Sequence, residues 1–238
     1  MVGLVVEGAS DQIYLSAVLS WLQNLARQNN CDLLPCQLEQ AEGKAFSGYV
    51  TAAKLLQIKG CGQVIILRDS DFRNCGPKEK RRVEQHLQQR CPNLKISVTV
   101  AEPEIEAWIL ADAHCVSQAC GTHYSASPTG WSTNAATRNK LRNAKERLRT
   151  IVANSLKFRN TYKTVAPTEV EMARIFAPHF NIARAARLNS SALHFLRNLL
   201  THLVPQACRR RTLAHIGQQC QLSKNPTFRR WFNGGSVP

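Results

Sequence analysis

The sequence predicts an α/β fold: a mainly parallel sheet flanked by helices, followed by a basic, mostly helical C-terminal appendage. Two observations carry this prediction. Apolar runs rich in Val, Ile and Leu alternate with helical patterns over the first 112 of 238 residues, as in βαβ units. The remainder shows helical patterns and no convincing strand. We therefore expect two regions, residues 1–120 and 121–238. The boundary lies at the start of a stretch of small and polar residues that begins near residue 121.

The elements of the first region follow from the period of their apolar residues. Residues 2–7 form an apolar run that predicts a strand. Ser10 or Asp11 is then expected to cap a helix whose apolar residues recur at a helical period over residues 13–25. Gly60 is placed to end a later helix. The further strands are expected at residues 33–38, 63–68 and 95–100, and the further helices at 47–58 and 77–89.

The charge of the chain is divided unevenly between its halves. Residues 1–112 carry 12 basic and 13 acidic side chains, a net charge of −1, whereas residues 113–238 carry 19 basic and 3 acidic ones, a net charge of +16. Such asymmetry predicts a polyanionic partner, most simply nucleic acid, although a well-solvated basic surface is the alternative. The candidate nucleic-acid-binding residues are Arg138, Lys140, Arg142, Lys145, Arg147, Arg149, Arg209, Arg210 and Arg211.

The cysteines and the apolar runs bear on the compartment of the protein. Nine cysteines cannot all pair, and their spacing shows no regular framework. The first residues lack the charged flank of a targeting segment. No apolar run approaches the ~20 residues that span a bilayer. We therefore expect a cytoplasmic protein with reduced thiols and no membrane partner.

Three acidic stretches each follow a predicted strand, so their carboxylates are expected at the carboxyl edge of the sheet, where open α/β sheets place their sites. Two aspartates separated by one residue repel each other unless a cation lies between them. Oxygen ligands gathered in this way suit Mg²⁺ or Mn²⁺. The sequence therefore predicts a divalent-metal site, and its candidate acids are Glu7 and Asp11, Asp69 and Asp71, and Glu102, Glu104 and Glu106.

Each stretch taken alone also fits a purely structural interpretation. The first could be a helix-capping arrangement, and the second a turn or a cap. The third could hold acids favoured at a helix start, with Pro103 at the first helical position. Arg68, which precedes the second stretch, is expected to form a structural ion pair. The order and strand context of all three stretches together favour the metal site.

The order of these motifs resembles the Toprim domain, a Rossmann-like fold found in topoisomerases, bacterial primases, recombination-repair proteins and OLD-family nucleases. In that domain a glutamate after the first strand precedes an Asp-x-Asp after a later one, as Glu7 precedes Asp69-Ser70-Asp71 here. The stretch 104–112 resembles a narrower group of small bacterial Toprim-like proteins. These are often encoded beside ABC- or AAA-type ATPases, and some belong to phage-defence systems. The resemblance covers residues 1–112 well and the remainder loosely.

The resemblance implies roles for individual residues. Glu7 would be the acid/base residue or a metal ligand, and Asp69 and Asp71 would be metal ligands. Asp11 resembles an additional acid of OLD-type nucleases. Phe72 stands where Toprim domains often carry a glycine, which weakens the assignment to a subfamily. The remaining candidates are Glu104 and Glu106, for a second metal position, and Lys163, for holding phosphate or transition-state charge.

The function expected from these features is that of a divalent-metal-dependent nuclease. It would hydrolyse nucleic acid phosphodiesters, with DNA favoured over RNA, as the effector of a bacterial defence or DNA-repair system that works with an ATPase partner. The alternative is a noncatalytic adaptor that binds nucleic acid and an ATPase, which the short chain and the lack of an ATP-binding loop favour. A phosphatase using Asp-x-Asp as nucleophile and acid is a weaker alternative, because there the motif normally follows the first strand.

Overall fold

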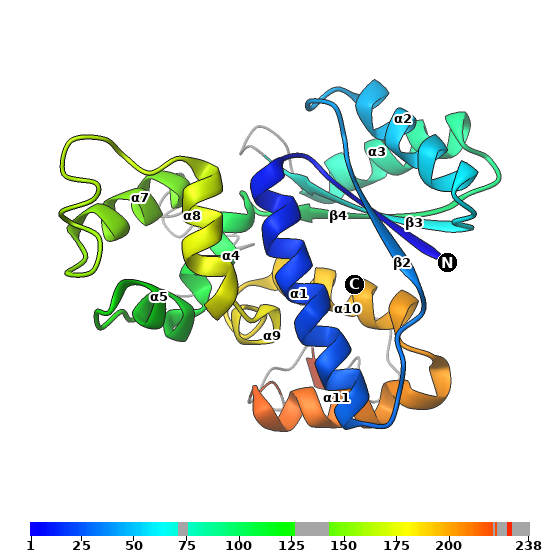
Figure 1. The fold of residues 1–238 in the computed structure, drawn as a ribbon. Helices are drawn as coiled ribbons and strands as arrows, with labels where there is room; N and C mark the ends of the chain where they lie inside the picture. The colour runs from blue at the N-terminus through cyan, green and yellow to red at the C-terminus, as the bar shows by residue number, and fades with distance from the viewer. Residues whose placement is uncertain (71–75, 127–142, 221, 223–227, 230–238) are drawn as a thin grey trace.

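A four-stranded, all-parallel sheet forms the centre of the molecule, with strand order β2-β1-β3-β4 (Figure 1). The computed structural model describes residues 1–70, 76–126, 143–220, 222 and 228–229. The α/β class with a parallel sheet flanked by helices, expected from the sequence, is confirmed. The strands are β1 (Val2–Val6), β2 (Cys36–Gln40), β3 (Gln63–Asp69) and β4 (Lys95–Ala101).

Helices cover both faces of the sheet, and the central strands β1 and β3 are buried on both sides. On one face, Val5, Val64 and Ile66 pack against α2 (Phe46–Ile58) and α3 (Gly76–Arg90). On the other face, the alternate strand residues join a larger buried cluster with α1 (Ala9–Gln28). Figure 1 shows α2 and α3 on one side of the sheet and α1 on the other. This two-sided burial explains why β1 and β3 form nearly continuous apolar runs, whereas the partly exposed β2 does not.

Two details of the first region differ from the sequence-based expectations. The α1 helix is capped by Gly8, and neither Ser10 nor Asp11 is its N-cap, because the helix begins at Ala9 and the Asp11 carboxylate instead accepts the Gly8 amide at 2.9 Å. The second strand begins at Cys36, three residues later than expected. Pro35 has no amide hydrogen, and its carbonyl only accepts the amide of Val2 at 2.9 Å.

The described part of the chain after residue 120 contains helices and no β-strand. Its buried side chains join the same cluster as α1 and one face of the sheet, so the core extends across residue 120. The predicted domain boundary itself stays a prediction. None of the helices in the described ranges has the length and apolar character that a membrane crossing requires. The remaining helices are α4 (Ile105–Ala111), α5 (Ala113–Cys120), α7 (Ala144–Asn154), α8 (Glu169–Phe176), η1 (Ala177–His179), α9 (Ile182–Ala185), α10 (Ser190–Leu203) and α11 (Gln206–Gln219).

Asp112 connects the end of α4 to the helices of the second half. Its buried carboxylate accepts the amides of Cys115 at 3.2 Å and Asn181 at 3.0 Å, so it caps α5 and contacts the start of α9. The guanidinium of Arg184 donates two further hydrogen bonds to it, at 2.7 and 3.0 Å. A paired arginine and two amides replace the water that the buried carboxylate has lost.

Replacing Asp112 with asparagine is therefore expected to destabilise the fold by about 3 kcal/mol, because it breaks a buried ion pair. Chemical denaturation gives the free energy of unfolding of the variant and of the wild type. Glu146→Gln is the matched control, since it breaks the ion pair of Glu146 with Arg149 on the surface. The control should cost less than ~1 kcal/mol. Equal costs for the two variants would contradict the structural role of Asp112.

Candidate metal centre

The ends of the two central strands position the first two acids. Glu7 directly follows β1, and Asp69 is the last residue of β3. These strands are hydrogen-bonded neighbours, with Val5 opposite Ile66. The chain moves outward from β1 to β2 and then crosses back to β3, so the strand order reverses between β1 and β3. The carboxyl edge at such a switch point is where open α/β sheets bind their ligands.

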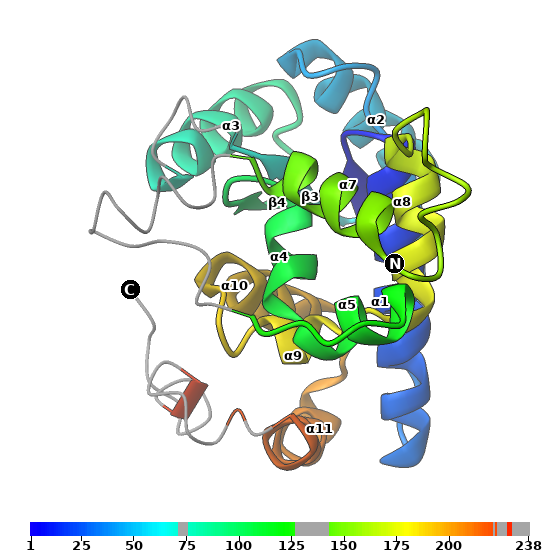
Figure 2. The ribbon, with the colours of Figure 1, turned by 90° about the vertical axis from the view of Figure 1, so that its left-hand side faces the viewer.

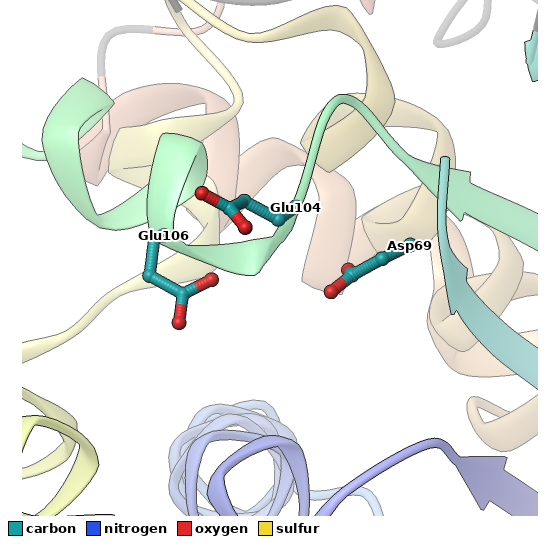
Figure 3. Close-up of side chains that lie close together, drawn as sticks. All are labelled: Asp69, Glu104 and Glu106. Atoms are coloured by element: carbon teal, nitrogen blue, oxygen red, sulfur yellow. The ribbon is translucent and has the colours of Figure 1, made fainter. Parts of the chain in front are cut away.

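Asp69, Glu104 and Glu106 come together at this edge. Each offers a carboxylate oxygen, and these oxygens all lie within 4.8 Å of one another. Glu104 is the N-cap of α4 and Glu106 lies in its first turn, so Pro103 precedes the helix and is not its first residue. Figure 3 shows the side chain of Asp69 facing the start of α4, where the two glutamates lie. Glu102 is not a member of this group.

Backbone hydrogen bonds hold the two segments of the cluster together. The amide of Ser70, directly after Asp69, lies 3.0 Å from the carbonyl oxygens of Ala101 and Pro103. The hydroxyl of Ser191 accepts the amide of Glu102 at 3.1 Å and the indole N–H of Trp108 at 2.8 Å. The end of β3, the turn after β4 and the start of α10 therefore support the position of α4.

Three side chains surround the carboxylate of Glu7, whose side chain is 7% exposed. Tyr49 donates its hydroxyl to Glu7 Oε1 at 2.5 Å. Arg68 Nε lies 3.8 Å from the same oxygen, and Lys44 Nζ lies 3.8 Å from Oε2. Arg68 also pairs with the buried Glu79 at 3.2 Å. This is a structural ion pair of the kind expected for Arg68 from the sequence. These contacts hold the Glu7 carboxylate in place at the sheet edge.

Burial and mutual repulsion raise the pKa values of Asp11, Asp69 and Glu106. Burial is the main cause for Asp11, whose pKa rises from 3.8 to about 6, and for Glu106, whose pKa rises from 4.5 to about 7. Burial also raises the pKa of Asp69 well above its ordinary value, and the charges of Asp11, Glu106, Glu7 and Glu104 add to the effect. The five acids therefore form one electrostatically coupled group.

Lys145 supplies a cation to this group. Its ammonium lies 3.8 Å from Glu104, 3.9 Å from Glu106 and 2.9 Å from Glu169, and its amide donates to Glu104 at 2.8 Å. We had expected Lys145 to contact nucleic acid, but its ammonium faces the acids. The cluster itself, Asp69, Glu104 and Glu106, therefore sets three carboxyl groups against this one ammonium.

The chemistry of the site fits a divalent cation such as Mg²⁺ or Mn²⁺. The available donors are carboxylate oxygens, which these ions prefer. The hydroxyl of Tyr14, three residues after Asp11 on the same helix, is buried and has no hydrogen-bond partner among the described residues. The pKa of Tyr14 is raised first by burial and then by the charges of Glu106 and neighbouring acids, so the hydroxyl lies within their electrostatic reach. Asp69, Glu104 and Glu106 are the residues that would hold the ion.

The other predicted site residues lie elsewhere or outside the described part of the chain. Asp71, Arg138, Lys140 and Arg142 belong to residues that the structure does not describe. Lys163 is exposed in the segment between α7 and α8.

The remaining arginines of the basic set differ in their surroundings. Arg149 pairs with Glu146 and donates to the carbonyl of Pro167. Arg209 donates to the carbonyls of Thr201 and Val204, at and just after the end of α10. Among the described members of the set, Arg147, Arg210 and Arg211 are exposed.

Sequence reasoning did not find the residues that support the acids. Tyr49 contacts Glu7 from 42 residues away. Lys145 belongs to a run of similar basic residues, and nothing in that run distinguishes it.

Comparison with known proteins leaves this site to be interpreted from its own geometry. The chain matches no family model, and neither a curated protein nor a solved structure matches it. The resemblance of its acidic stretches to the Toprim pattern therefore stays a hypothesis.

The raised pKa of Glu106 predicts a pH dependence of stability in metal-free protein. Between about pH 4.5 and pH 7 the folded state retains a proton that the unfolded chain has released. The stability that this group contributes is therefore present below its unfolded pKa and is lost as the pH rises through its folded pKa. Relative to Glu106→Gln, the wild type should lose free energy of unfolding across this window, as chemical denaturation in EDTA at a series of pH values would measure.

Glu42→Gln provides the control, because Glu42 is exposed and lies outside the acidic group. It shows how far the removal of a carboxylate outside the group changes the free energy of unfolding at each pH. If the difference between Glu106→Gln and the wild type changes with pH no more than the difference for this control, the surroundings of Glu106 do not disfavour its ionised form.

Proposed function

We propose that the protein is a Toprim-like nuclease that hydrolyses nucleic acid phosphodiesters with the help of a divalent metal ion. The observation that carries this proposal is the convergence of Asp69, Glu104 and Glu106 within 4.8 Å at the carboxyl edge of a parallel sheet. Glu7 follows the neighbouring strand, in the order that the Toprim pattern requires. The fold and the acids thus support the same proposal independently.

The residues of the site have different tasks in this proposal. Asp69, Glu104 and Glu106 would bind Mg²⁺ or Mn²⁺, and Glu7 would add a further carboxylate in an orientation held by Tyr49. A divalent ion bound there supplies a polarised water and neutralises charge that develops on the phosphodiester. Asp11, with a pKa of about 6, can accept or release a proton near neutral pH, which suits a general acid or base.

The choice of nucleic acid as substrate rests on the charge of the second half, +16 over residues 113–238. Backbone phosphates bind such a surface without sequence preference. Exposed residues such as Arg147, Arg210 and Arg211 are available for this contact. DNA is the first candidate. An ATPase partner and a role in phage defence or DNA repair belong to the proposal through the Toprim resemblance alone.

Lys145 favours a second candidate, a noncatalytic adaptor or a nuclease that becomes active only with a partner. Its ammonium already lies against two of the proposed metal ligands, Glu104 and Glu106. A cation in this position competes with a metal ion for the same carboxylates. In this alternative the isolated chain binds nucleic acid without cutting it, and the addition of an ATPase partner is required for cleavage.

Replacing Asp69 with asparagine tests the metal-dependent chemistry. Cleavage of plasmid and single-stranded DNA in Mg²⁺ or Mn²⁺ should fall by more than ~100-fold, beyond the typical cost of losing an outer-shell partner of a metal. DNA binding in EDTA should be largely retained. Glu42→Gln should cleave as the wild type does.

Two results would decide against parts of this proposal. Undiminished cleavage by Asp69→Asn would remove the acidic cluster from the chemistry. Absence of cleavage by the wild type in either metal, followed by cleavage after addition of an ATPase partner, would favour the second candidate.

A further inference from the structure

A groove of about 700 Å³ lies along β4, the last strand of the sheet in the described part of the chain, and outside the acidic cluster. Its floor is formed by β4, which ends the strand order of the sheet, and its walls are formed by α3 and α10. Figure 2 shows these two helices on either side of the sheet, with β4 between them. The lining includes Glu102, two residues before the metal-site candidate Glu104. The groove therefore leads to the carboxyl edge of the sheet.

The cations that line this groove come from both walls and outnumber its two carboxylates, Glu84 and Glu102. Lys80 and Arg81 line it from α3, and Arg197 lines it from α10. His194 lies on the same wall as Arg197. Burial lowers the pKa of His194 first, and the charges of Lys80 and Arg197 lower it further, so both cations act on the same part of the groove. Such a potential attracts anions.

The two helices also direct their amino-terminal halves toward the carboxyl edge. Pro77 lines the groove at the start of α3, and Ser190 lines it at the start of α10. Helix amino-termini carry a partial positive charge that favours phosphate. The side-chain cations and the helix amino-termini therefore both favour the binding of an anion at the end of the groove nearest the acids.

The edge of β4 is not free to accept a peptide strand. Glu84 accepts the amide of Val98 at 3.1 Å, and so occupies a donor that an added β-strand would need. Lys80 lies 3.8 Å from Glu84 and offsets its charge. The chemistry of the groove is that of an anion-binding channel rather than a strand-addition site.

We propose that this groove binds one strand of a nucleic acid through its phosphates and leads it to the acidic site. A charged channel that follows the backbone of one strand is the usual way to bind single-stranded nucleic acid. The proposal rests on the proposed function for its choice of nucleic acid. It assigns the contact to Arg81 and Arg197, which are not among the nucleic-acid-binding residues that the sequence suggested.

The binding of a fluorescent single-stranded oligodeoxynucleotide to the full chain, measured by anisotropy in EDTA, tests this assignment. Arg197→Glu should weaken binding by roughly 10-fold or more at low salt. Arg197→Gln should reduce the slope of log K against log salt by about 0.7 for each lost phosphate contact. Arg81→Glu, at an exposed position, repeats the test at a site where folding is not at risk.

The matched control is Lys54→Glu, the same change of charge on the exposed side of α2, away from the groove. It should bind the oligonucleotide nearly as the wild type does. If Arg197→Glu and Arg81→Glu, both folded by circular dichroism, bind no worse than this control, the groove is not the binding surface. Preference for a duplex of the same sequence over the single strand would also overturn the proposal.

A small phosphodiester separates this proposal from the proposed function. Bis(para-nitrophenyl) phosphate requires no groove, so Arg197→Glu should hydrolyse it in Mn²⁺ at the wild-type rate. Loss of oligonucleotide binding with retained hydrolysis supports the groove. If the wild type hydrolyses neither substrate, and Arg197→Glu still binds the oligonucleotide more weakly than the wild type does, the nuclease function is contradicted and the binding groove is supported.

Discussion

Repulsion between carboxylates at the edge of the sheet is the constraint on which the account of this protein depends. Folding brings Asp69, Glu104 and Glu106 within 4.8 Å of one another and places Glu7 and Asp11 within electrostatic reach. Burial makes the ionisation of Asp11, Asp69 and Glu106 costly, and the charges of neighbouring acids add to this cost. The packing of a core that extends over both halves of the chain must offset it. A bound cation would relieve the repulsion.

The second half of the chain takes part in the site as well as in the core. Lys145 of α7 contacts the acids, and Ser191 of α10 fixes both the turn after β4 and Trp108 of α4. Asp112 and Arg184 join α4, α5 and α9. From the sequence we expect the acids of the first half to perform the chemistry and the basic second half to bind nucleic acid. The two halves do differ in charge, but both contribute residues that build the acidic site. The helices also build the support on which α4 presents its glutamates.

The parts of this structure that were predictable depend on local pattern. Strands buried on both faces leave apolar runs, and acids directly after such runs lie at the carboxyl edge, so Glu7 and Asp69 could be placed from the sequence. The N-cap predicted for α1, Ser10 or Asp11, was wrong because Gly8 is the N-cap. Glycine has no side chain that could cap the helix, so a search for capping side chains does not find it. Which glutamate after β4 joins Asp69, and the position of Lys145, depend on how α4 and α7 pack. Such contacts, 35 or more residues apart, leave no local signal.

The central claim is that the acidic cluster is a cation site, and diffraction from crystals soaked in Mn²⁺ tests it most directly. The account predicts an anomalous peak with carboxylate oxygens of Asp69 and of Glu104 or Glu106 at about 2.1 Å, as for Mg²⁺, and an ammonium of Lys145 that has moved away. A cluster without a peak, with Lys145 still paired to Glu104 and Glu106, would contradict it.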